Sequence, residues 1–385
     1  MPTITPLAKN ILIVAGDISG DLHACSLMRE LKKAAPDVCL TAIGGPRMKE
    51  YADHYLFDLA SQGASGFVEP LKKMPLWMKL MKQIRQYMET QNPAAVIAVD
   101  FYGFNHQVLN MAAHRGIPAY YYVTPQVWAS RQYRAKQLAR LTKKMYTIYP
   151  FEPDFHKKFG GNAVFLGNPL LDIMPKPQEH VFPAQEDAKY YNWKLGILPG
   201  SRHGEISRLA PVFYQTFKQV LKEFPNTQAY LFALPDANEQ EILSYLGENP
   251  HPNFHIIKDQ DYKMRSQMDY LLACSGTATL ENALLGVPMV VAYKLSWATY
   301  HIAKAVIKVK YISLVNLLAD KPVVKELIQQ DANPKALSAE VMSMFQNPAN
   351  LVAQRDELLK LRASLGKKGV AARAAKDILA DIVQK

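Results

Sequence analysis

Short β-branched segments alternate with longer helical patterns through most of the chain, and this alternation starts again once. The first series of apolar segments lies at 10–14, 38–43, 95–99, 119–123 and 144–148. A second series lies at 194–198, 228–233, 254–257, 270–273 and 288–292. Strands separated by helical segments are typical of βαβ units, which build parallel sheets covered by helices on both faces. The chain is therefore predicted to be an α/β protein with two Rossmann-like domains.

The domain boundaries follow from the break between the two series. Residues 1–170 are predicted to form the N-terminal domain and residues 194–340 the C-terminal domain. Residues 171–193 are rich in proline and polar side chains, which disfavour both helix and sheet, so we predict a linker. Residues 341–385 are charged and helical, and we expect them to pack back on the N-terminal domain. Two such domains are expected to face each other across a cleft at the carboxyl ends of their strands, where open α/β sheets bind ligands.

Composition excludes several classes of protein. The 385 residues are 49% hydrophobic and 21% charged, which is incompatible with a mainly disordered chain. The N-terminus lacks the pattern of a signal peptide, and the longest apolar stretch is shorter than the roughly 18 to 20 residues of a membrane-spanning helix. Cys25, Cys39 and Cys274 form no C-x-x-C pair, and the histidines have no metal-ligand spacing. We expect a cytoplasmic protein with no metal and no cofactor.

The charge balance points to an anionic partner. There are 45 Lys and Arg residues against 34 Asp and Glu, a formal net charge of +11. Nucleic acid, an anionic membrane surface and a phosphorylated small molecule would all suit this charge. The sequence contains no RNA-binding module and no basic stripe interleaved with aromatic residues. Nucleic acid is therefore the least favoured partner.

A glycine-containing loop follows the first predicted strand. We predict that Gly16, Asp17, Ser19 and Gly20 contact a ligand, because glycines permit close approach of the backbone and the next helix offers free N–H groups. The alternative is a tight strand-to-helix turn in which Ser19 or Asp21 is the N-cap.

Asp100 follows the predicted strand 95–99 directly. A carboxylate just beyond a buried strand projects toward the ligand-binding edge, where partial desolvation raises its pKa and makes it a general base. The alternative is that Asp100 caps the next helix.

The loop after strand 194–198 opens the second domain as the glycine loop opens the first. Arg202 carries a fixed, planar cation that suits phosphate oxygens, and Ser201 adds a hydroxyl beside backbone N–H groups. A surface arginine in a turn is the alternative, but its place at a strand's carboxyl end favours a ligand contact.

The segment after strand 270–273 is the strongest local signal. Ser275, Gly276 and Thr277 place hydroxyls and free N–H groups at a helix N-terminus, which attracts a diphosphate through the helix dipole. Glu281 follows one helical turn later and could accept hydrogen bonds from ribose hydroxyls. Alternatively, Thr277 only caps the helix and Glu281 only offsets its dipole.

A basic amphipathic stretch covers residues 75–89. Its apolar side chains recur at helical spacing opposite several cations, as in helices that lie in a membrane interface. The residues predicted to contact the membrane are Lys72, Lys73, Trp77, Met81 and Ile84. The alternative is an ordinary amphipathic helix packed on the sheet, because a core stripe has the same spacing.

With these residues in place, the sequence resembles the lipid A disaccharide synthase family, whose fold is the two-Rossmann architecture called GT-B. The resemblance covers nearly the whole chain in order. Its motifs are 15–21, Gly44–Met48, Asp100–Asn105, Tyr122–Ala129, Phe151–Glu152, Gly167–Pro169, Leu198–Arg202 with Glu205, Ser275–Glu281 and Ser313–Leu318. The sequence departs from the family pattern at Asp17, Gly103, Asn168 and Ser130, where Glu, Asp, His and Trp respectively are common.

The resemblance implies an inverting hexosyltransferase of lipopolysaccharide biosynthesis. It would transfer 2,3-diacylglucosamine from its UDP derivative to 2,3-diacylglucosamine 1-phosphate, forming a β-1,6 disaccharide and releasing UDP. Asp100 would deprotonate the acceptor 6-hydroxyl, and Glu281 would bind ribose. Asn316 and Gln126 would contact substrate, and the glycine loop would face the acceptor or the transferred sugar. The residues that would hold the diphosphate are Ser201, Arg202, Ser275, Gly276 and Thr277.

The resemblance also implies a peripheral enzyme on the cytoplasmic face of the inner membrane. Residues 1–170 would then form the acceptor and membrane side, and residues 194–340 the donor side. The alternative enzyme is another GT-B protein that uses a UDP-sugar, such as an epimerase or a transferase with a different acceptor. An epimerase would consume no lipid acceptor.

Overall fold

The computed structural model describes residues 10–63, 74–235, 237–258, 261–295 and 310–383. The chain divides into two compact units. Unit 1 consists of Met1–Asp172 and Leu365–Lys385, and unit 2 consists of Ile173–Ser364. Within the described ranges, no helix is both long and apolar enough to span a membrane.

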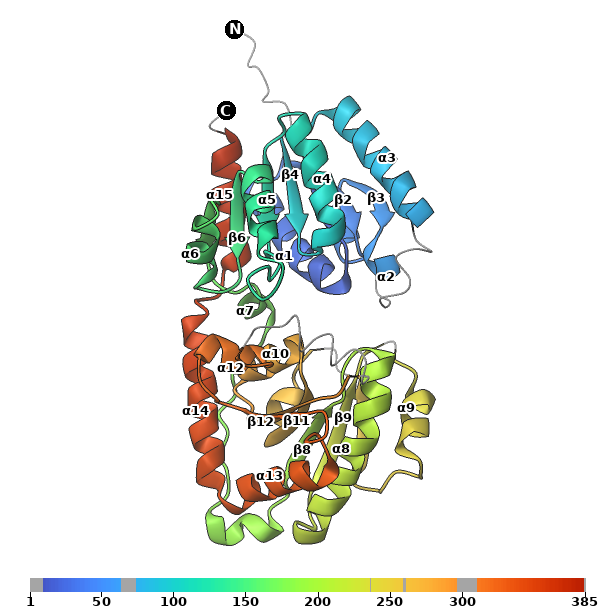
Figure 1. Ribbon diagram of the computed structural model, residues 1–385, viewed down its shortest axis with the longest axis vertical. Coiled ribbons are helices and arrows are strands. Elements are labelled where there is room, and N and C mark those ends of the chain that lie inside the picture. The colour runs from blue at the N-terminus through green and yellow to red at the C-terminus, as the bar shows by residue number, and fades with distance from the viewer. Residues whose placement is uncertain (1–9, 64–73, 236, 259–260, 296–309, 384–385) are drawn as a thin grey trace. The chain divides into compact units, whose positions relative to one another are not determined.

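The sheet of unit 1 has seven described strands in the order β3-β2-β1-β4-β5-β6-β7, and all neighbouring pairs are parallel (Figure 1). The strands are β1 (Asn10–Ala15), β2 (Cys39–Gly44), β3 (His54–Asp58), β4 (Ala95–Val99), β5 (Ala119–Tyr122), β6 (Lys144–Thr147) and β7 (Ala163–Phe165). The edge strands β3 and β7 were not predicted. No residue of either strand is buried, and each has only three consecutive apolar residues, Tyr55–Phe57 and Ala163–Phe165, which is shorter than the apolar runs that identify the inner strands.

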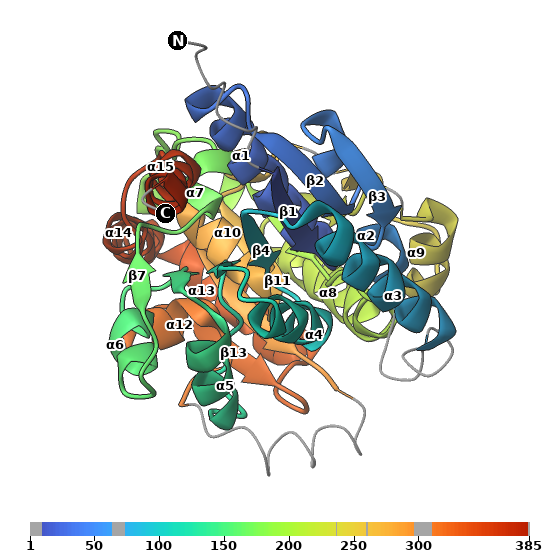
Figure 2. The ribbon, with the colours of Figure 1, turned by 90° about the horizontal axis from the view of Figure 1, so that it is seen from above.

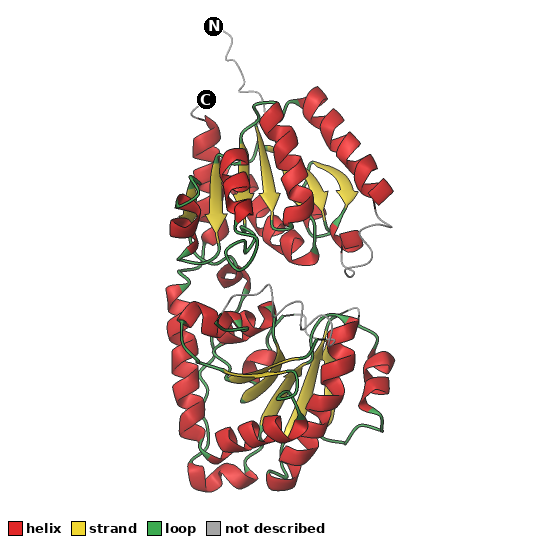
Figure 3. Cartoon of the chain, in the orientation of Figure 1, coloured by secondary structure: helices red, strands yellow, loops and turns green. Residues whose placement is uncertain are grey.

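Helices cover both faces of this sheet (Figure 3). The helices of unit 1 are α1 (Ile18–Ala34), α2 (Ala60–Gly63), α3 (Met74–Gln91), α4 (Tyr102–His114), α5 (Tyr133–Leu141), α6 (Glu152–Lys157), α15 (Val370–Val383) and the start of α7 (Leu170–Ile173). One core joins Ile11 and Ile13 to α1 and α15. The other joins Leu12 and Val14 to α3, α4 and α5. This alternation along β1 explains why the strand is apolar throughout.

The last helix, α15, returns to unit 1 from the far end of the chain and packs beside α1 (Figure 2). The Asp172 carboxylate caps the N-terminus of α15 by accepting hydrogen bonds from the backbone N–H groups of Gly369, Val370 and Ala371. The Tyr120 hydroxyl donates to Asp381 over 2.8 Å. These contacts fasten α15 to the sheet.

Unit 2 has a second parallel sheet, whose described strands run in the order β10-β9-β8-β11-β12-β13. The strands are β8 (Lys194–Leu198), β9 (Gln228–Ala233), β10 (Phe254–Lys258), β11 (Tyr270–Cys274), β12 (Met289–Tyr293) and β13 (Lys325–Ile328). The described helices are α8 (His203–Glu223), α9 (Glu239–Leu246), α10 (Thr277–Leu285), α12 (Leu314–Ala319), α13 (Pro334–Gln346) and α14 (Pro348–Ser364). Trp193 stacks on Phe345 of α13 with ring centroids 4.0 Å apart, at the base of this unit's core.

Both sheets reverse their strand order at one point, between β1 and β4 in unit 1 and between β8 and β11 in unit 2. The loops that leave the two strands at such a point diverge to opposite faces of the sheet and leave a crevice, which is where doubly wound sheets bind ligands. The Gly16 loop and Asp100 follow β1 and β4. The Ser201 and Ser275 segments follow β8 and β11, so four predicted ligand-binding segments lie at two switch points.

Candidate active site

The loop after β1 is tightly packed against the segment after β4. A Cβ added to Gly16 would lie 1.9 Å from Cδ1 of Phe101, so only glycine fits. Asp17 is the N-cap of α1, and its Oδ1 accepts the Gly20 N–H over 2.6 Å. The alternative that Ser19 or Asp21 is the N-cap is therefore wrong. Ser19 is exposed at this edge.

Asp21 has a different structural role, which sequence reasoning missed. It is 1% exposed, and its carboxylate accepts the backbone N–H groups of Gly45, Arg47 and Met48. The carboxylate thereby holds the Gly44–Met48 motif against α1. The hydrogen bonds of this buried carboxylate are therefore structural.

Asp100 has an unusual backbone conformation. Its φ is 47° and that of Phe101 is 45°, both in the left-handed region that costs non-glycine residues about 1 to 3 kcal/mol. Its carbonyl accepts hydrogen bonds from the Tyr121 hydroxyl at 2.6 Å and the Asn105 amide at 2.8 Å, which hold this conformation. The N-cap of α4 is Phe101, so the alternative that Asp100 caps that helix is wrong.

The electrostatic surroundings of Asp100 suit a base. Burial, followed by the negative charge of Asp17, raises the pKa of Asp100 from 3.8 to about 7. Burial also raises the pKa of Asp17, against the opposing effect of its hydrogen bond from Gly20. A carboxylate with a pKa near 7 accepts protons far more effectively than an ordinary aspartate, and about half of it is still ionised at neutral pH.

Gln126 belongs to the loop after β5, the neighbour of β4. Its side chain is half-buried, and Nε2 donates to the Tyr149 hydroxyl at 3.3 Å. The structure therefore places Gln126 at the same edge of the sheet as Asp100.

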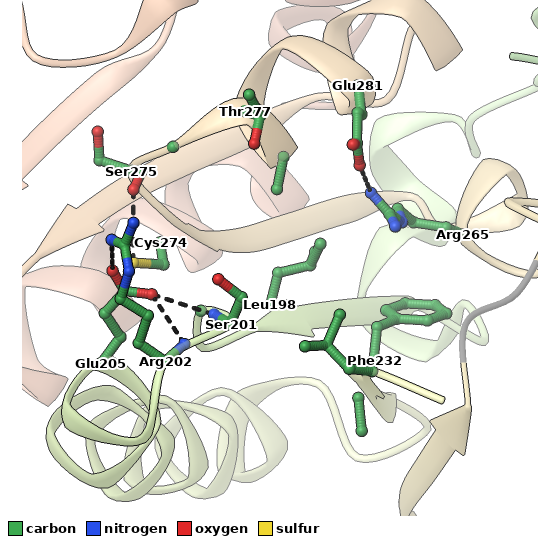
Figure 4. Close-up of a pocket in the computed structure, with 15 residues that line it drawn as sticks. Leu198, Ser201, Arg202, Glu205, Phe232, Arg265, Cys274, Ser275, Thr277 and Glu281 are labelled. Atoms are coloured by element: carbon green, nitrogen blue, oxygen red, sulfur yellow. Dashed lines mark hydrogen bonds and ion pairs between the residues drawn. The ribbon is translucent and has the colours of Figure 1, made fainter. Parts of the chain in front are cut away.

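A pocket of about 430 Å³ lies at the switch point of unit 2 (Figure 4). Six of the predicted substrate-binding residues line it: Ser201, Arg202, Ser275, Gly276, Thr277 and Glu281. Polar side chains line it together with apolar ones such as Leu198, Phe232 and Leu234, as in most small-molecule sites.

The β8–α8 loop is organised by Glu205. Its Oε2 accepts the backbone N–H groups of Ser201 and Arg202, and its Oε1 accepts Nη1 of Arg202 at 2.9 Å (Figure 4). Gly200 has φ 118°, and an added Cβ would lie 2.6 Å from Cβ of Glu205. The Arg202 side chain is 78% exposed, so it can turn toward a ligand at little cost.

The β11–α10 turn presents the start of a nine-residue helix to the pocket. Gly276 is the N-cap and has no side chain to cap the first N–H groups, while Thr277 is the first helical residue. The alternative that Thr277 is the cap is therefore wrong. Gly276 and Thr277 are both exposed, so these N–H groups are accessible to an anion.

Glu281 forms an ion pair that the sequence did not indicate. Its Oε2 lies 2.8 Å from Nη1 of Arg265, which is 7% exposed and also donates to Asn282 (Figure 4). Arg265 precedes β11 in a 3-10 turn and lies over the Tyr262 ring. No local motif marks this arginine; only the fold brings it to the pocket.

Asn316 does not reach this pocket. It is 1% exposed, its Nδ2 donates to the Val324 carbonyl and Glu326, and its Oδ1 accepts the Val324 N–H. The side chain joins α12 to β13 in the interior of unit 2. This corrects the prediction that Asn316 contacts substrate directly.

The amphipathic stretch forms α3. Part of its apolar face is buried in the core, and part is half-buried or exposed. Ile84 is fully buried in the core with Leu80, so the prediction that it contacts a membrane is corrected. Trp77 and Met81 are half-buried at the edge of that core, and Met78 is 68% exposed. Lys72 and Lys73 lie outside the described residues.

No cluster of three or more His, Cys, Asp or Glu side chains that could hold a metal occurs among the residues that the structure describes.

Residues 11–382 match the family model described as lipid-A-disaccharide synthetase. The lipid-A-disaccharide synthase of Nitrosococcus oceani is 35% identical over 360 residues, 93% of each chain. That of Syntrophus aciditrophicus is 35% identical over 376 residues, 96% of each chain. The chain belongs to the lipid-A-disaccharide synthase family. Its activity is the synthesis of the lipid A disaccharide, and the resemblance drawn from the motifs is confirmed.

Solved structures confirm the GT-B fold of this synthase family member. The Staphylococcus aureus protein MnaA in complex with UDP superposes with a TM-score of 0.66 at 12% identity, covering 98% of each chain. The calicheamicin glycosyltransferase CalG4 superposes with a TM-score of 0.60 at 14% identity, again covering 98% of each chain. UDP-N-acetylglucosamine 2-epimerases share this fold. The family match favours the synthase over the epimerase alternative.

Proposed function

We propose that Asp100 is the general base of an inverting glycosyl transfer and that the pocket of unit 2 holds the UDP group of the donor. The acceptor 6-hydroxyl gives its proton to Asp100 as its oxygen bonds to the anomeric carbon. The bond from that carbon to the UDP oxygen breaks, and UDP leaves with the bonding electrons. The observation that carries this proposal is the raised pKa of a carboxylate at one switch point, with a cation and an open helix N-terminus at the other.

The leaving group needs stabilisation because negative charge grows on the diphosphate. The Arg202 guanidinium and the free N–H groups at the start of α10 would supply it. Ser201 and Ser275 would add hydroxyl groups. When the diphosphate binds, Arg202 exchanges part of its contact with Glu205 for phosphate oxygens.

Glu281 would accept hydrogen bonds from ribose hydroxyls, with Arg265 holding its carboxylate in place. A carboxylate fixed by an ion pair loses less conformational entropy on binding than a free side chain. The loop at Gly16–Gly20 and Gln126 would contact the acceptor or the transferred sugar.

The proposed substrates are UDP-2,3-diacylglucosamine and 2,3-diacylglucosamine 1-phosphate, joined by a β-1,6 linkage. Such acylated substrates reside in a bilayer, so the enzyme would work as a peripheral protein on the cytoplasmic face of the inner membrane. Trp77, Met78 and Met81 provide apolar contact area on α3, and exposed Lys82 and Arg85 provide charge toward anionic headgroups.

The test is incubation of the full chain with both acylated substrates, followed by mass analysis of the lipid product. The proposal predicts a disaccharide monophosphate that forms only when both substrates are present, with one UDP released per disaccharide. Release of UDP without a disaccharide, or conversion of the donor without an acceptor, would contradict it.

A further inference from the structure

A buried glutamate in unit 1 is not used by the proposed chemistry. Glu152 is fully buried at the start of α6. Its Oε2 accepts the backbone N–H groups of Ile148 and Tyr149, at 2.8 and 2.9 Å. Its Oε1 accepts the indole Nε1–H of Trp128 at 2.9 Å. One carboxylate oxygen thus closes the β6–α6 turn, while the other reaches a side chain in the loop after β5.

The indole that Glu152 holds is part of an aromatic cluster. The Trp128 ring meets the Phe151 ring edge to face at a centroid distance of 5.1 Å, and the Tyr149 ring at 6.1 Å. Tyr149 and Phe151 are stacked, with an interplanar angle of 12°. Tyr149 and Glu152 are buried, whereas Trp128 is half-buried and Phe151 is 38% exposed. The cluster therefore presents ring surface outward from a rigid base.

This aromatic cluster lies at the edge of the sheet that carries Asp100. The strands β4, β5 and β6 are neighbours, and Asp100, Trp128 and Tyr149 follow them in that order. Gln126 joins the same group through the Tyr149 hydroxyl. Burial raises the pKa of Tyr149, and the charges of Glu152 and then Asp100 raise it further.

We propose that Glu152 is a positioning residue that fixes the Trp128 indole as a wall against which the acceptor sugar ring packs beside Asp100. This inference rests on the proposed function. The C–H groups on one face of a glucosamine ring carry partial positive charge and pack well on the electron-rich face of an aromatic ring. A ring held by a buried hydrogen bond gives such contact at low entropic cost, and it orients the acceptor hydroxyl for proton transfer.

The variant Glu152→Gln separates the two functions of this carboxylate. Its amide oxygen can still accept the N–H groups of Ile148 and Tyr149, so the turn is retained. Its amide nitrogen then faces the indole N–H as donor against donor, and the Trp128 contact is lost. Trp128→Phe removes the same hydrogen bond from the other side. If both act through one contact, the double variant should be no worse than the more severe single variant.

The measurement is the initial rate with varied acceptor at saturating donor, together with UDP binding by calorimetry. We expect Glu152→Gln to raise the acceptor KM about tenfold, the effect of losing about 1.4 kcal/mol of ring contact, while UDP affinity stays unchanged. The exposed Glu186→Gln is the matched control and should show neither effect. Phe151→Leu should also raise the acceptor KM, whereas Tyr190→Leu, at an exposed aromatic residue of unit 2, should not.

An unchanged acceptor KM in folded Glu152→Gln would overturn the positioning role, as would additive effects in the double variant. An equal rise in the KM for the acceptor and the KM for the donor would show that Glu152 only stabilises the fold. This result would also overturn the positioning role. Failure of the proposed function is distinguishable, because the unsubstituted enzyme would then form no disaccharide at all. If Glu152→Gln fails to fold, Trp128→Phe and Phe151→Leu provide the same test without altering the carboxylate.

Discussion

The Arg265 guanidinium donates to the Glu281 carboxylate over 2.8 Å at the wall of the unit 2 pocket. Arg265 is 7% exposed, so its removal would leave the carboxylate without its cation in a partly desolvated site. We expect Arg265→Met to weaken UDP binding about tenfold, and Glu281→Gln to weaken it similarly, with a double variant that is less than additive. Calorimetric titration with UDP measures this. The exposed Arg140→Met is the control, and full UDP affinity in a folded Arg265→Met would exclude this role of the pair.

Arg202 should act on the phosphates and not on the nucleoside. Its side chain is 78% exposed, so Arg202→Ala should fold normally. We expect UDP affinity to fall about tenfold to a hundredfold, while the weaker affinity for uridine stays unchanged. The matched control is Arg208→Ala, at an exposed arginine of α8, the helix that follows Arg202. Equal losses for UDP and uridine would show that Arg202 supports the pocket in general.

The pH dependence should report the Asp100 carboxyl. The pKa of this group is raised to about 7, and only its ionised form can accept a proton, so kcat/KM should fall as the pH drops through about 7. Asp17→Asn removes the neighbouring negative charge but keeps an N-cap residue. It should lower the pKa of Asp100 and move the inflection to lower pH. A profile of kcat/KM against pH for the unsubstituted enzyme and for Asp17→Asn measures this. An inflection that does not move would show that the charge of Asp17 does not affect the pKa of Asp100.

Membrane contact should depend on the outer part of the α3 apolar face. Trp77→Ser with Met81→Ser should lower binding to anionic vesicles, with a smaller effect on unfolding than Ile84→Ser, because Ile84 is fully buried. Co-sedimentation with vesicles and thermal unfolding measure the two effects. Full retention of the Trp77 and Met81 variant on anionic vesicles would exclude α3 as the contact.

The sequence predicted the parts of the fold that depend on local patterns. Inner strands of a parallel sheet are buried on both faces and read as continuous apolar runs, so their carboxyl ends, and with them Asp100, Arg202 and Ser275, could be located. Edge strands such as β13, with one buried residue, lack that signal. Helical spacing identified α3 but could not separate buried Ile84 from half-buried Trp77, since a core stripe and a membrane stripe have the same period.

The remaining site residues depend on contacts between distant segments. Arg265 meets Glu281 across 16 positions, Asp21 meets Gly45 across 24, and Glu152 meets Trp128 across 24. The role of a buried charged side chain depends on the group that it contacts. When that group is distant in the sequence, the contact can be identified only from the folded structure. Asn316 shows the converse, because its motif suggested a ligand contact while its amide is used within unit 2.

Asp100→Asn should retain the fold and gain stability at alkaline pH. The folded-state pKa is raised from 3.8 to about 7, so the folded state binds more protons than the unfolded state between these values, and stability falls as the pH rises through that range. Removing the charge should therefore raise the free energy of unfolding at pH 8 by about 1 to 4 kcal/mol, since one pKa unit is worth about 1.4 kcal/mol. Asparagine also tolerates the left-handed φ of 47°. Denaturant unfolding measures this.

The turnover of this same Asp100→Asn variant tests the general-base assignment most directly. The measurement is disaccharide formation from both acylated substrates at pH 8, with UDP binding measured on the same sample. The account predicts a loss of turnover of about a hundredfold or more, with UDP affinity unchanged. Near-normal turnover with intact UDP binding would contradict it.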